Sequence, residues 1–245
     1  MATVFTVTSG KGGVGKSSLS AGLGIALARR GKKVLLIDCD AGLRSLDLLL
    51  NLSEKTMFDL GDVLEKRCTP SQAVYDVAQV KQLFLIPAPA QAGVLDDAAR
   101  LQQALQFYQE KCDIIILDAP AGIDAAFDTT VACADLVLTV ATADPVCLRD
   151  AGKVAELIAQ KGKNARLLIN KMDLSLVRKS KLPNMDESID AACLQLIGIV
   201  PYDPKVLLAA VQGKALQKGK AAAAMDRIAG RLLGEKIRLP KAKKI

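Results

Sequence analysis

Short runs of Val, Ile and Leu alternate along the chain with longer stretches in which apolar residues recur at helical spacing. The apolar runs predict strands at 4–8, 34–38, 83–86, 113–118, 136–140, 167–170 and 197–200. The stretches between them predict helices near 16–30, 93–111, 124–132, 145–161, 186–195, 204–212 and 220–236. Most strand runs are continuously apolar, which is typical of parallel strands covered on both faces. The pattern therefore predicts an α/β fold: a doubly wound, mostly parallel sheet with helices on both faces and ligands at the carboxyl ends of its strands.

Two segments need separate interpretation. Residues 51–81 are the least regular, and we interpret them as short helices inserted beside the ligand site.

In the last predicted helix, apolar residues follow i, i+3, i+4, i+7, i+8 spacing, which indicates a face packed on the sheet. These residues are Met225, Ile228, Ala229, Leu232 and Leu233. No repeat, linker or composition shift marks a second domain, so we expect one domain over 1–236 and a short basic tail over 237–245.

Composition narrows the classes of function. The chain has 245 residues, of which 51% are hydrophobic, so it can bury a large core. We find no apolar run near the roughly 18 residues of a membrane span and expect no signal peptide. The six cysteines never form a C-x-x-C pair, which favours a reducing cytoplasm. The chain has no histidine, which excludes acid–base chemistry by histidine and disfavours a zinc site.

The net charge of +7 is concentrated at one end of the chain. Residues 213–245 carry ten Lys or Arg and two Asp or Glu, which leaves 23 basic and 24 acidic residues in the first 212. Such asymmetry indicates a polyanionic partner near the C-terminus, either a membrane surface or nucleic acid. A solvated helix face followed by a loose tail explains it equally well, so the alternatives stay open.

Residues 9–18 read SGKGGVGKSS and match the phosphate-loop pattern G-x-x-x-x-G-K-S between a predicted strand and a predicted helix. Glycines let backbone N–H groups wrap the β-phosphate, and the helix N-terminus adds positive potential. Lys16 would reach the β- and γ-phosphates, and the Ser17 hydroxyl would bind Mg²⁺. The predicted nucleotide-binding residues in this loop are Gly10, Lys11, Gly12, Gly13, Val14, Gly15, Lys16, Ser17 and Ser18.

Lys11 has no role in an ordinary phosphate loop. The form GKGGVGKS resembles the deviant Walker A signature of the MinD/ParA family of ATPases. The resemblance implies that Lys11 crosses to the nucleotide of a second subunit, so that two ATP molecules lie between two protomers. A cation supplied in trans neutralises charge on the transferred phosphoryl group and makes dimerisation depend on the γ-phosphate.

Three carboxylates come at predicted strand ends. Asp38 and Asp40 lie two positions apart in IDCD, so in extended backbone they share one face. Asp118 follows four apolar residues in a Walker B pattern and would hold a water on Mg²⁺, while Gly122 lets the next loop approach the γ-phosphate. The resemblance implies that Asp40 orients the attacking water and that Asp38 lies near the metal, although the sequence does not separate these two roles. We therefore predict Lys11, Lys16 and Asp40 as catalytic and Ser17, Asp38 and Asp118 at the metal.

Further motifs extend the resemblance over most of residues 2–234. The runs IDCDAGLRSLDLLL, DAPAGID and DPVCLRDAGKV are similar to family members that place the bacterial division site. Asp150, in LRD, matches a position at the dimer face near the signature lysine. IGIVPYDPKVLLAAVQGKAL is similar to the family's adenine-side loop, which implies that Pro201 and Asp203 lie beside the base. The resemblance is weak in 51–110 and fails at the end of the chain.

The identity of the base has two interpretations. Asn170 to Asp173 read NKMD, which fits the guanine reader of many GTPases. In the MinD/ParA family an asparagine at this strand end pairs with adenine instead, and Asp173 is then a loop residue or a helix cap. We favour ATP, because Lys11 and the VPYDPK loop follow the ATPase pattern.

The resemblance also implies partners and a location. It implies an ATP-dependent homodimer in the cytoplasm and partners that inhibit septum assembly and stimulate ATP hydrolysis. The tail at 237–245 lacks the bulky apolar residues of a membrane-targeting helix, so we expect only weak contact with the anionic inner face of the cell membrane, strengthened when a dimer presents two tails. A DNA-partitioning ATPase with a basic end on DNA is the alternative.

Overall fold

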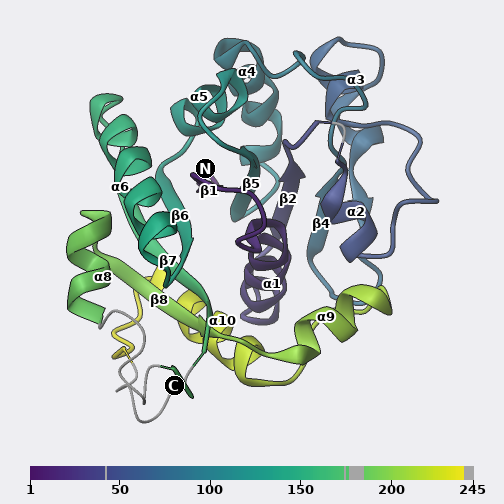
Figure 1. Ribbon diagram of the computed structural model, residues 1–245. Coiled ribbons are helices and arrows are strands. Elements are labelled where there is room, and N and C mark those ends of the chain that lie inside the picture. The colour runs from purple at the N-terminus through teal and green to yellow at the C-terminus, as the bar shows by residue number, and fades with distance from the viewer. Residues whose placement is uncertain (42, 174, 177–184, 240–245) are drawn as a thin grey trace.

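The computed structural model describes residues 1–41, 43–173, 175–176 and 185–239. They contain an eight-stranded sheet in the order β3-β4-β2-β5-β1-β6-β7-β8 (Figure 1). Seven strands are parallel: β1 (Thr3–Ser9), β2 (Val34–Asp38), β4 (Leu83–Ile86), β5 (Ile114–Ala121), β6 (Leu136–Thr142), β7 (Ala165–Met172) and β8 (Leu196–Pro201). The short edge strand β3 (Tyr75–Asp76) is antiparallel to β4. The predicted α/β class and parallel sheet are confirmed.

Helices cover both faces of this sheet (Figure 1). Within β5, Ile114 and Ile116 belong to a core shared with α1 (Lys16–Arg29) and α10 (Lys220–Leu232). Ile115 and Leu117 belong to a core shared with α3 (Leu60–Leu64) and α4 (Ala98–Gln109). This alternation follows from the period of two in a strand, because both faces must be apolar when both are covered. The longer helices are α1 (Lys16–Arg29), α4 (Ala98–Gln109), α5 (Ala125–Ala132), α6 (Pro145–Gln160), α8 (Met185–Ala192), α9 (Pro204–Val211) and α10 (Lys220–Leu232).

The predicted apolar face of the last helix packs as expected. Met225, Ile228 and Ala229 of α10 are buried in the core beneath the sheet, and Leu232 and Leu233 are partly buried against it. The helix lies against α1 and β8. It ends at Leu232 rather than at residue 236, because Gly234 adopts a positive φ of 86° that breaks the helical path.

The irregular segment at 51–81 consists of short elements, as predicted. The short helix beside the phosphate loop, however, comes just before residue 51 in the sequence. That element is α2 (Ser45–Leu49), whereas α3 (Leu60–Leu64) and the 3₁₀ turn Pro70–Ala73 follow within 51–81. Strand β3 was not predicted, because it is only two residues long and depends on the pairing of Tyr75 with Leu85. This segment therefore extends the β4 edge of the sheet rather than lining the site.

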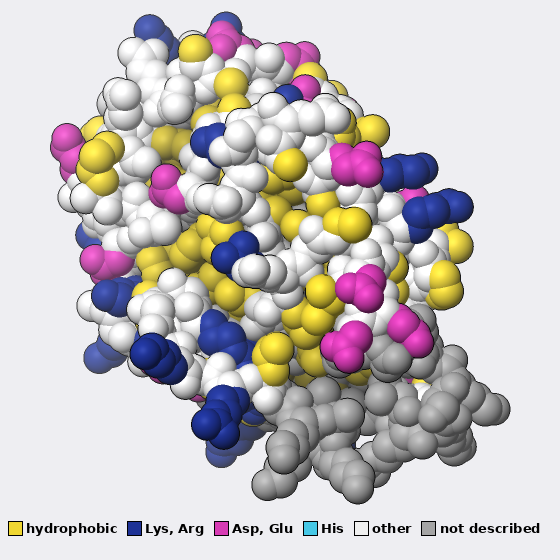
Figure 2. All heavy atoms as spheres, turned by 90° about the vertical axis from the view of Figure 1, so that its left-hand side faces the viewer, with side chains coloured by type: hydrophobic (Ala, Val, Ile, Leu, Met, Phe, Trp, Pro, Cys, Tyr) yellow, Lys and Arg dark blue, Asp and Glu magenta, His cyan; other side chains and the backbone are white. Residues whose placement is uncertain are grey.

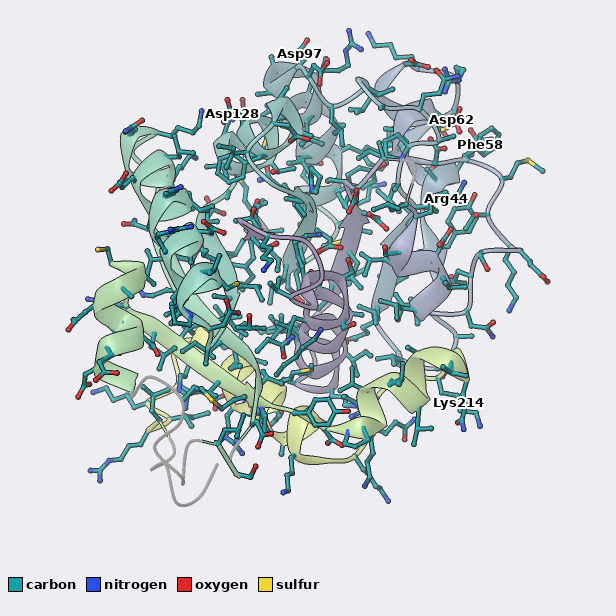
Figure 3. The ribbon with its side chains drawn as sticks, in the orientation of Figure 1. Arg44, Phe58, Asp62, Asp97, Asp128 and Lys214 are labelled. Carbon is teal, nitrogen blue, oxygen red and sulfur yellow. The ribbon has the colours of Figure 1, made fainter. Side chains whose placement is uncertain are left out.

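One helix boundary differs from the prediction for a local reason. The predicted helix at 93–111 begins only at Ala98, since the carboxylate of Asp97 accepts hydrogen bonds from the Ala99 and Arg100 amides and caps the helix. Asp97 is labelled at the top of Figure 3. In the part of the chain that the structure describes, none of the helices has the length and apolar character needed to cross a membrane.

Candidate nucleotide site

The phosphate loop joins the end of β1 to the start of α1. Gly13 and Gly15 have φ angles of 80° and 91°, which side chains rarely allow. Gly15 is also the residue immediately before α1, and a Cβ placed on it would lie 2.5 Å from Asn170 Nδ2. Glycine is thus required by backbone conformation at Gly13 and Gly15, and at Gly15 also by the close approach of β7.

Lys16 lies inside the molecule, between two of the predicted carboxylates. Its side chain is 7% exposed, and Nζ lies 3.4 Å from Asp118 Oδ1 and 4.0 Å from Asp40 Oδ2. The register of the sheet explains part of this convergence, because Asp38 of β2 is paired with Asp118 of β5. The structure therefore brings Lys16, Asp38, Asp40 and Asp118 together at the carboxyl edge, as the strand ends predict.

Asp38 differs from Asp40 in what it contacts. Its Oδ1 accepts a hydrogen bond from the Asp40 amide at 3.0 Å, and its Oδ2 accepts one from the Leu46 amide at 2.9 Å. Burial, and then the charge of Asp118, raise the pKa of Asp38 to about 7, against the opposing effect of the two amides. Asp38 thus links the backbone at Asp40 to the start of α2. These two contacts favour a role for Asp38 in positioning Asp40.

Asp40 faces the space in front of the phosphate loop. It lines a cavity of about 420 Å³ together with residues 11–18, and Leu43 and Leu48 line the same cavity with strongly exposed side chains. Burial raises the pKa of the Asp40 carboxyl, while the charge of Lys16 lowers it. A carboxylate in this position can accept a hydrogen bond from a water molecule in the cavity.

Asp118 is fully buried and has one oxygen engaged and one not. Its Oδ1 accepts a hydrogen bond from Ser20 Oγ at 2.7 Å, whereas no partner for Oδ2 is found among the described residues. Ser20 was not predicted, although it lies one helical turn after Lys16 and that spacing would have placed it on the same face of α1. An unpartnered buried carboxylate oxygen is costly unless a cation or water meets it.

The residues present fit a magnesium ion that also takes phosphate and water oxygens. Among the described residues no group of three His, Cys, Asp or Glu could hold a metal ion by itself. Mg²⁺ commonly uses only one or two protein ligands beside substrate phosphates and water. Ser17 lines the phosphate cavity, and Asp118 Oδ2 is an available acceptor nearby in the fold. These two residues are the better candidates for the metal, directly or through water.

A second cavity, of about 300 Å³, adjoins the first across Gly15 and Ser18. Its walls come from the ends of β7 and β8 and from α9, and they include Asn170, Pro201 and Tyr202. The cavity is mainly apolar and lies beside the helix N-terminus, where a nucleobase would follow its phosphates. Sequence reasoning placed Asn170 and Pro201 here, and it did not single out Tyr202 or Lys171.

The first two side chains of the NKMD segment contact the phosphate loop. Asn170 Nδ2 donates to the Val14 carbonyl at 2.8 Å, and Lys171 Nζ donates to the Gly13 carbonyl at 2.7 Å. Asp173 Oδ1 accepts hydrogen bonds from the amide and the hydroxyl of Ser175. Asp173 thus forms a local cap with Ser175.

Asp203 lines the base cavity, but its carboxylate binds backbone amides at the starts of two helices. Its Oδ1 accepts from the Lys205 amide at 3.0 Å and caps α9, and its Oδ2 accepts from the Ala221 amide at 3.2 Å at the start of α10. Although burial alone would raise its pKa, these amides hold the pKa below the ordinary value. Both carboxylate oxygens therefore accept hydrogen bonds from backbone amides, and Asp203 stabilises the wall of the base cavity.

The predicted interface residues Lys11 and Asp150 both lie at the start of the phosphate loop. Lys11 is exposed, and its carbonyl accepts a hydrogen bond from Ser9 Oγ at 3.0 Å. The charge of Lys11 contributes, after the Thr142 hydroxyl and the Cys147 amide, to lowering the pKa of Asp144. Asp150 approaches Gly10 so closely that a Cβ there would lie 3.0 Å from its carbonyl oxygen.

Comparisons with known proteins agree with this site. The model of the CobQ/CobB/MinD/ParA nucleotide binding domain matches residues 5–216. The septum site-determining protein MinD of Helicobacter pylori is 36% identical over 248 residues, which cover 97% of this chain and 92% of that protein. A solved MinC:MinD cell division protein complex from Aquifex aeolicus has a chain with a TM-score of 0.91 and 34% identity, covering 98% of this chain and 99% of its own. MinD of Pyrococcus horikoshii, solved with Mg-ADP, has a TM-score of 0.85 and 24% identity over 97% of this chain and all of its own, a likeness of fold.

Proposed function

Because this chain belongs to the CobQ/CobB/MinD/ParA nucleotide-binding family, we propose that it is an ATPase whose ATP-bound form dimerises and takes part in placing the division site. It would hydrolyse ATP to ADP and phosphate and use the bound nucleotide as a switch for assembly and location. The proposal rests on the family, on the similarity to septum site-determining proteins and on the two lysines of the phosphate loop.

The observation that carries the proposal is the contrast between Lys16 and Lys11. Lys16 is buried between Asp118 and Asp40, where it would contact the phosphates of its own nucleotide. Lys11, five positions earlier, is exposed on the wall of the phosphate cavity. An exposed cation at this position is suited to the phosphates of a second copy, and such a cation in trans raises phosphoryl-transfer rates strongly.

The other residues have distinct roles in this account. Bound Mg²⁺ would neutralise charge on the β- and γ-phosphates, held by the Ser17 hydroxyl and by Asp118, directly or through water. Asp40 would orient the attacking water, since it lines the phosphate cavity and its pKa is raised by burial. Asp38 would keep Asp40 in place through the amide that it binds.

We propose adenine as the base. Asn170 forms a wall of the base cavity and is already fixed by its bond to Val14, while Asp173 is engaged with Ser175. The test is competition of ATP and GTP against a bound fluorescent analogue of ADP. Displacement by GTP at lower concentration than by ATP would replace this part of the account with a guanine-specific switch.

Partners and location follow from the same proposal. The Aquifex aeolicus structure is of a complex between MinC and MinD, and we propose a division-inhibiting partner of that type and an ATPase-activating partner. On the face shown in Figure 2, Lys and Arg side chains gather at the lower left edge. We propose that the basic residues from position 213 onward, including the tail at 237–245, contact the anionic inner face of the cell membrane when ATP is bound.

The proposed activity has a direct test. Phosphate release should be slow, should require Mg²⁺ and should rise per molecule as the protein concentration rises, because each site needs a neighbour's Lys11. The Lys11→Ala variant should show low release at every concentration. Specific activity that is independent of concentration in the unchanged protein would contradict the trans arrangement.

A further inference from the structure

Two neighbouring side chains at the end of β7 reach the phosphate loop from outside. Asn170 Nδ2 bonds to the Val14 carbonyl and Lys171 Nζ bonds to the Gly13 carbonyl, across 156 and 158 positions of sequence. Consecutive residues of an extended strand point to opposite faces, so both would not ordinarily reach one loop. The fold therefore brings two donors to two consecutive carbonyl oxygens of the loop.

The backbone conformation of Lys171 explains how the side chains of Asn170 and Lys171 both reach the phosphate loop. Lys171 has a φ of 53°, in the left-handed region that non-glycine residues seldom adopt. This conformation is unfavourable for an ordinary residue and persists where the surrounding structure holds it. At Lys171 it accompanies a 2.7 Å hydrogen bond from a charged donor to the loop.

A phosphate cradle requires amides on its inner side and carbonyl oxygens on its outer side. A carbonyl that turned inward would present a lone pair to the phosphate and remove the favourable potential of the amides. We propose that Lys171 is a positioning residue of the phosphate loop, whose ammonium holds the Gly13 carbonyl outward so that the loop amides face the β-phosphate. This inference depends on the proposed binding of nucleotide at this loop.

The remainder of the Lys171 side chain makes a selective test feasible. Lys171 also lines the base cavity, and its Cε would lie 3.5 Å from a Cβ on Gly15. Lys171→Met keeps an unbranched apolar stem in that wall and removes the ammonium. Lys171→Arg keeps a cationic donor. Lys81→Met is the matched control, because Lys81 is an exposed lysine just before β4, at the opposite end of the strands.

The experiment measures dissociation constants for ATP, ADP and adenosine with Mg²⁺ present, by competition against a fluorescent ADP analogue. Loss of a charged hydrogen bond predicts that Lys171→Met weakens ATP and ADP by a similar factor of about ten or more and leaves adenosine unchanged. Lys171→Arg should recover most of the loss, and Lys81→Met should bind as the unchanged protein does.

The outcomes separate this inference from the proposed function. Unchanged ATP and ADP affinity in Lys171→Met, an equal loss for adenosine, or no recovery in Lys171→Arg would each overturn the role of the ammonium. If the unchanged protein itself fails to bind ATP and ADP, the proposed function is wrong, and that result is seen before any variant is compared.

Discussion

Lys16 and Asp118, 102 positions apart in the sequence, meet below the phosphate loop with Nζ 3.4 Å from Oδ1. Both side chains are buried, and Ser20 donates to the same carboxylate oxygen. The positive charge of the lysine that would bind phosphates is therefore balanced by a buried carboxylate. Each member of this group can be changed separately, and each change predicts a different result.

Asp118→Asn should remove the dependence of nucleotide binding on magnesium. The amide keeps an acceptor for Ser20 but lacks the charge that would hold the metal, so Mg·ATP should bind about tenfold more weakly or worse. In excess EDTA, Asp118→Asn should bind ATP no more weakly than the unchanged protein does. The reason is that the variant has no Asp118 carboxylate to compete with the phosphates for the Lys16 ammonium group. Asp128→Asn is the control. Asp128 is an exposed residue of α5 (Figure 3), and its Oδ1 lies 3.0 Å from Lys161 Nζ. Equal loss with and without Mg²⁺ would argue against a metal role.

Ser20→Ala should destabilise the fold through Asp118. The change removes a 2.7 Å donor from a buried carboxylate, and a hydrogen bond to a charged group contributes about 1.5–3 kcal/mol to the free energy of unfolding. Urea unfolding of the nucleotide-free protein measures the loss. Ser53→Ala, at an exposed turn, should leave the midpoint unchanged. A similar midpoint for both variants would show that Asp118 does not depend on Ser20.

Gly15→Ala should damage both the loop and its contact with β7. Alanine would be strained at a φ of 91°, and its Cβ would lie 2.5 Å from Asn170 Nδ2. We expect a loss of about 1–3 kcal/mol in the free energy of unfolding and no detectable nucleotide binding. Gly12→Ala should leave the free energy of unfolding nearly unchanged, because a Cβ there meets no atom within 4 Å. Equal stability of the two variants by thermal unfolding would contradict this geometry.

Asp38 should make the stability of the nucleotide-free protein depend on pH. Its pKa is about 7 in the folded protein against an ordinary value of 3.8, so between these values the folded chain holds a proton that the unfolded chain has released. Its contribution to the free energy of unfolding is therefore present below pH 3.8 and is lost as the pH rises towards and through 7. Asp38→Asn lacks this loss, so its stability relative to the unchanged protein should rise as the pH increases from 3.8 to about 7, the range between the two pKa values. A difference that stays constant over that range would show that Asp38 has an ordinary pKa.

Local patterns were sufficient for much of the site. The phosphate loop could be predicted because its glycines, Lys16 and Ser17 are consecutive and lie between a strand and a helix. Asp38, Asp40 and Asp118 could be predicted because parallel strands end at one edge, whatever the details of the loops. The packed face of α10 was readable from spacing alone, since Met225, Ile228 and Ala229 are buried.

What the sequence did not predict depends on contacts between distant segments. Ser20 has the signal of helical spacing, but its role requires knowledge of where Asp118 lies. Lys171 contacts Gly13 only because its backbone is left-handed, which lysine does not signal. Asp203 was predicted beside the base and lines that cavity, but the sequence did not signal that backbone amides at the starts of two helices occupy its carboxylate oxygens.

Sedimentation velocity with the Asp40→Ala variant loaded with Mg·ATP tests the central claim most directly. The account predicts dimers with ATP, monomers with ADP, and monomers when Lys11→Ala is added to that variant while ATP binding stays nearly intact. ATP-loaded Asp40→Ala that remains monomeric at high concentration would contradict the claim that nucleotide joins two copies through Lys11.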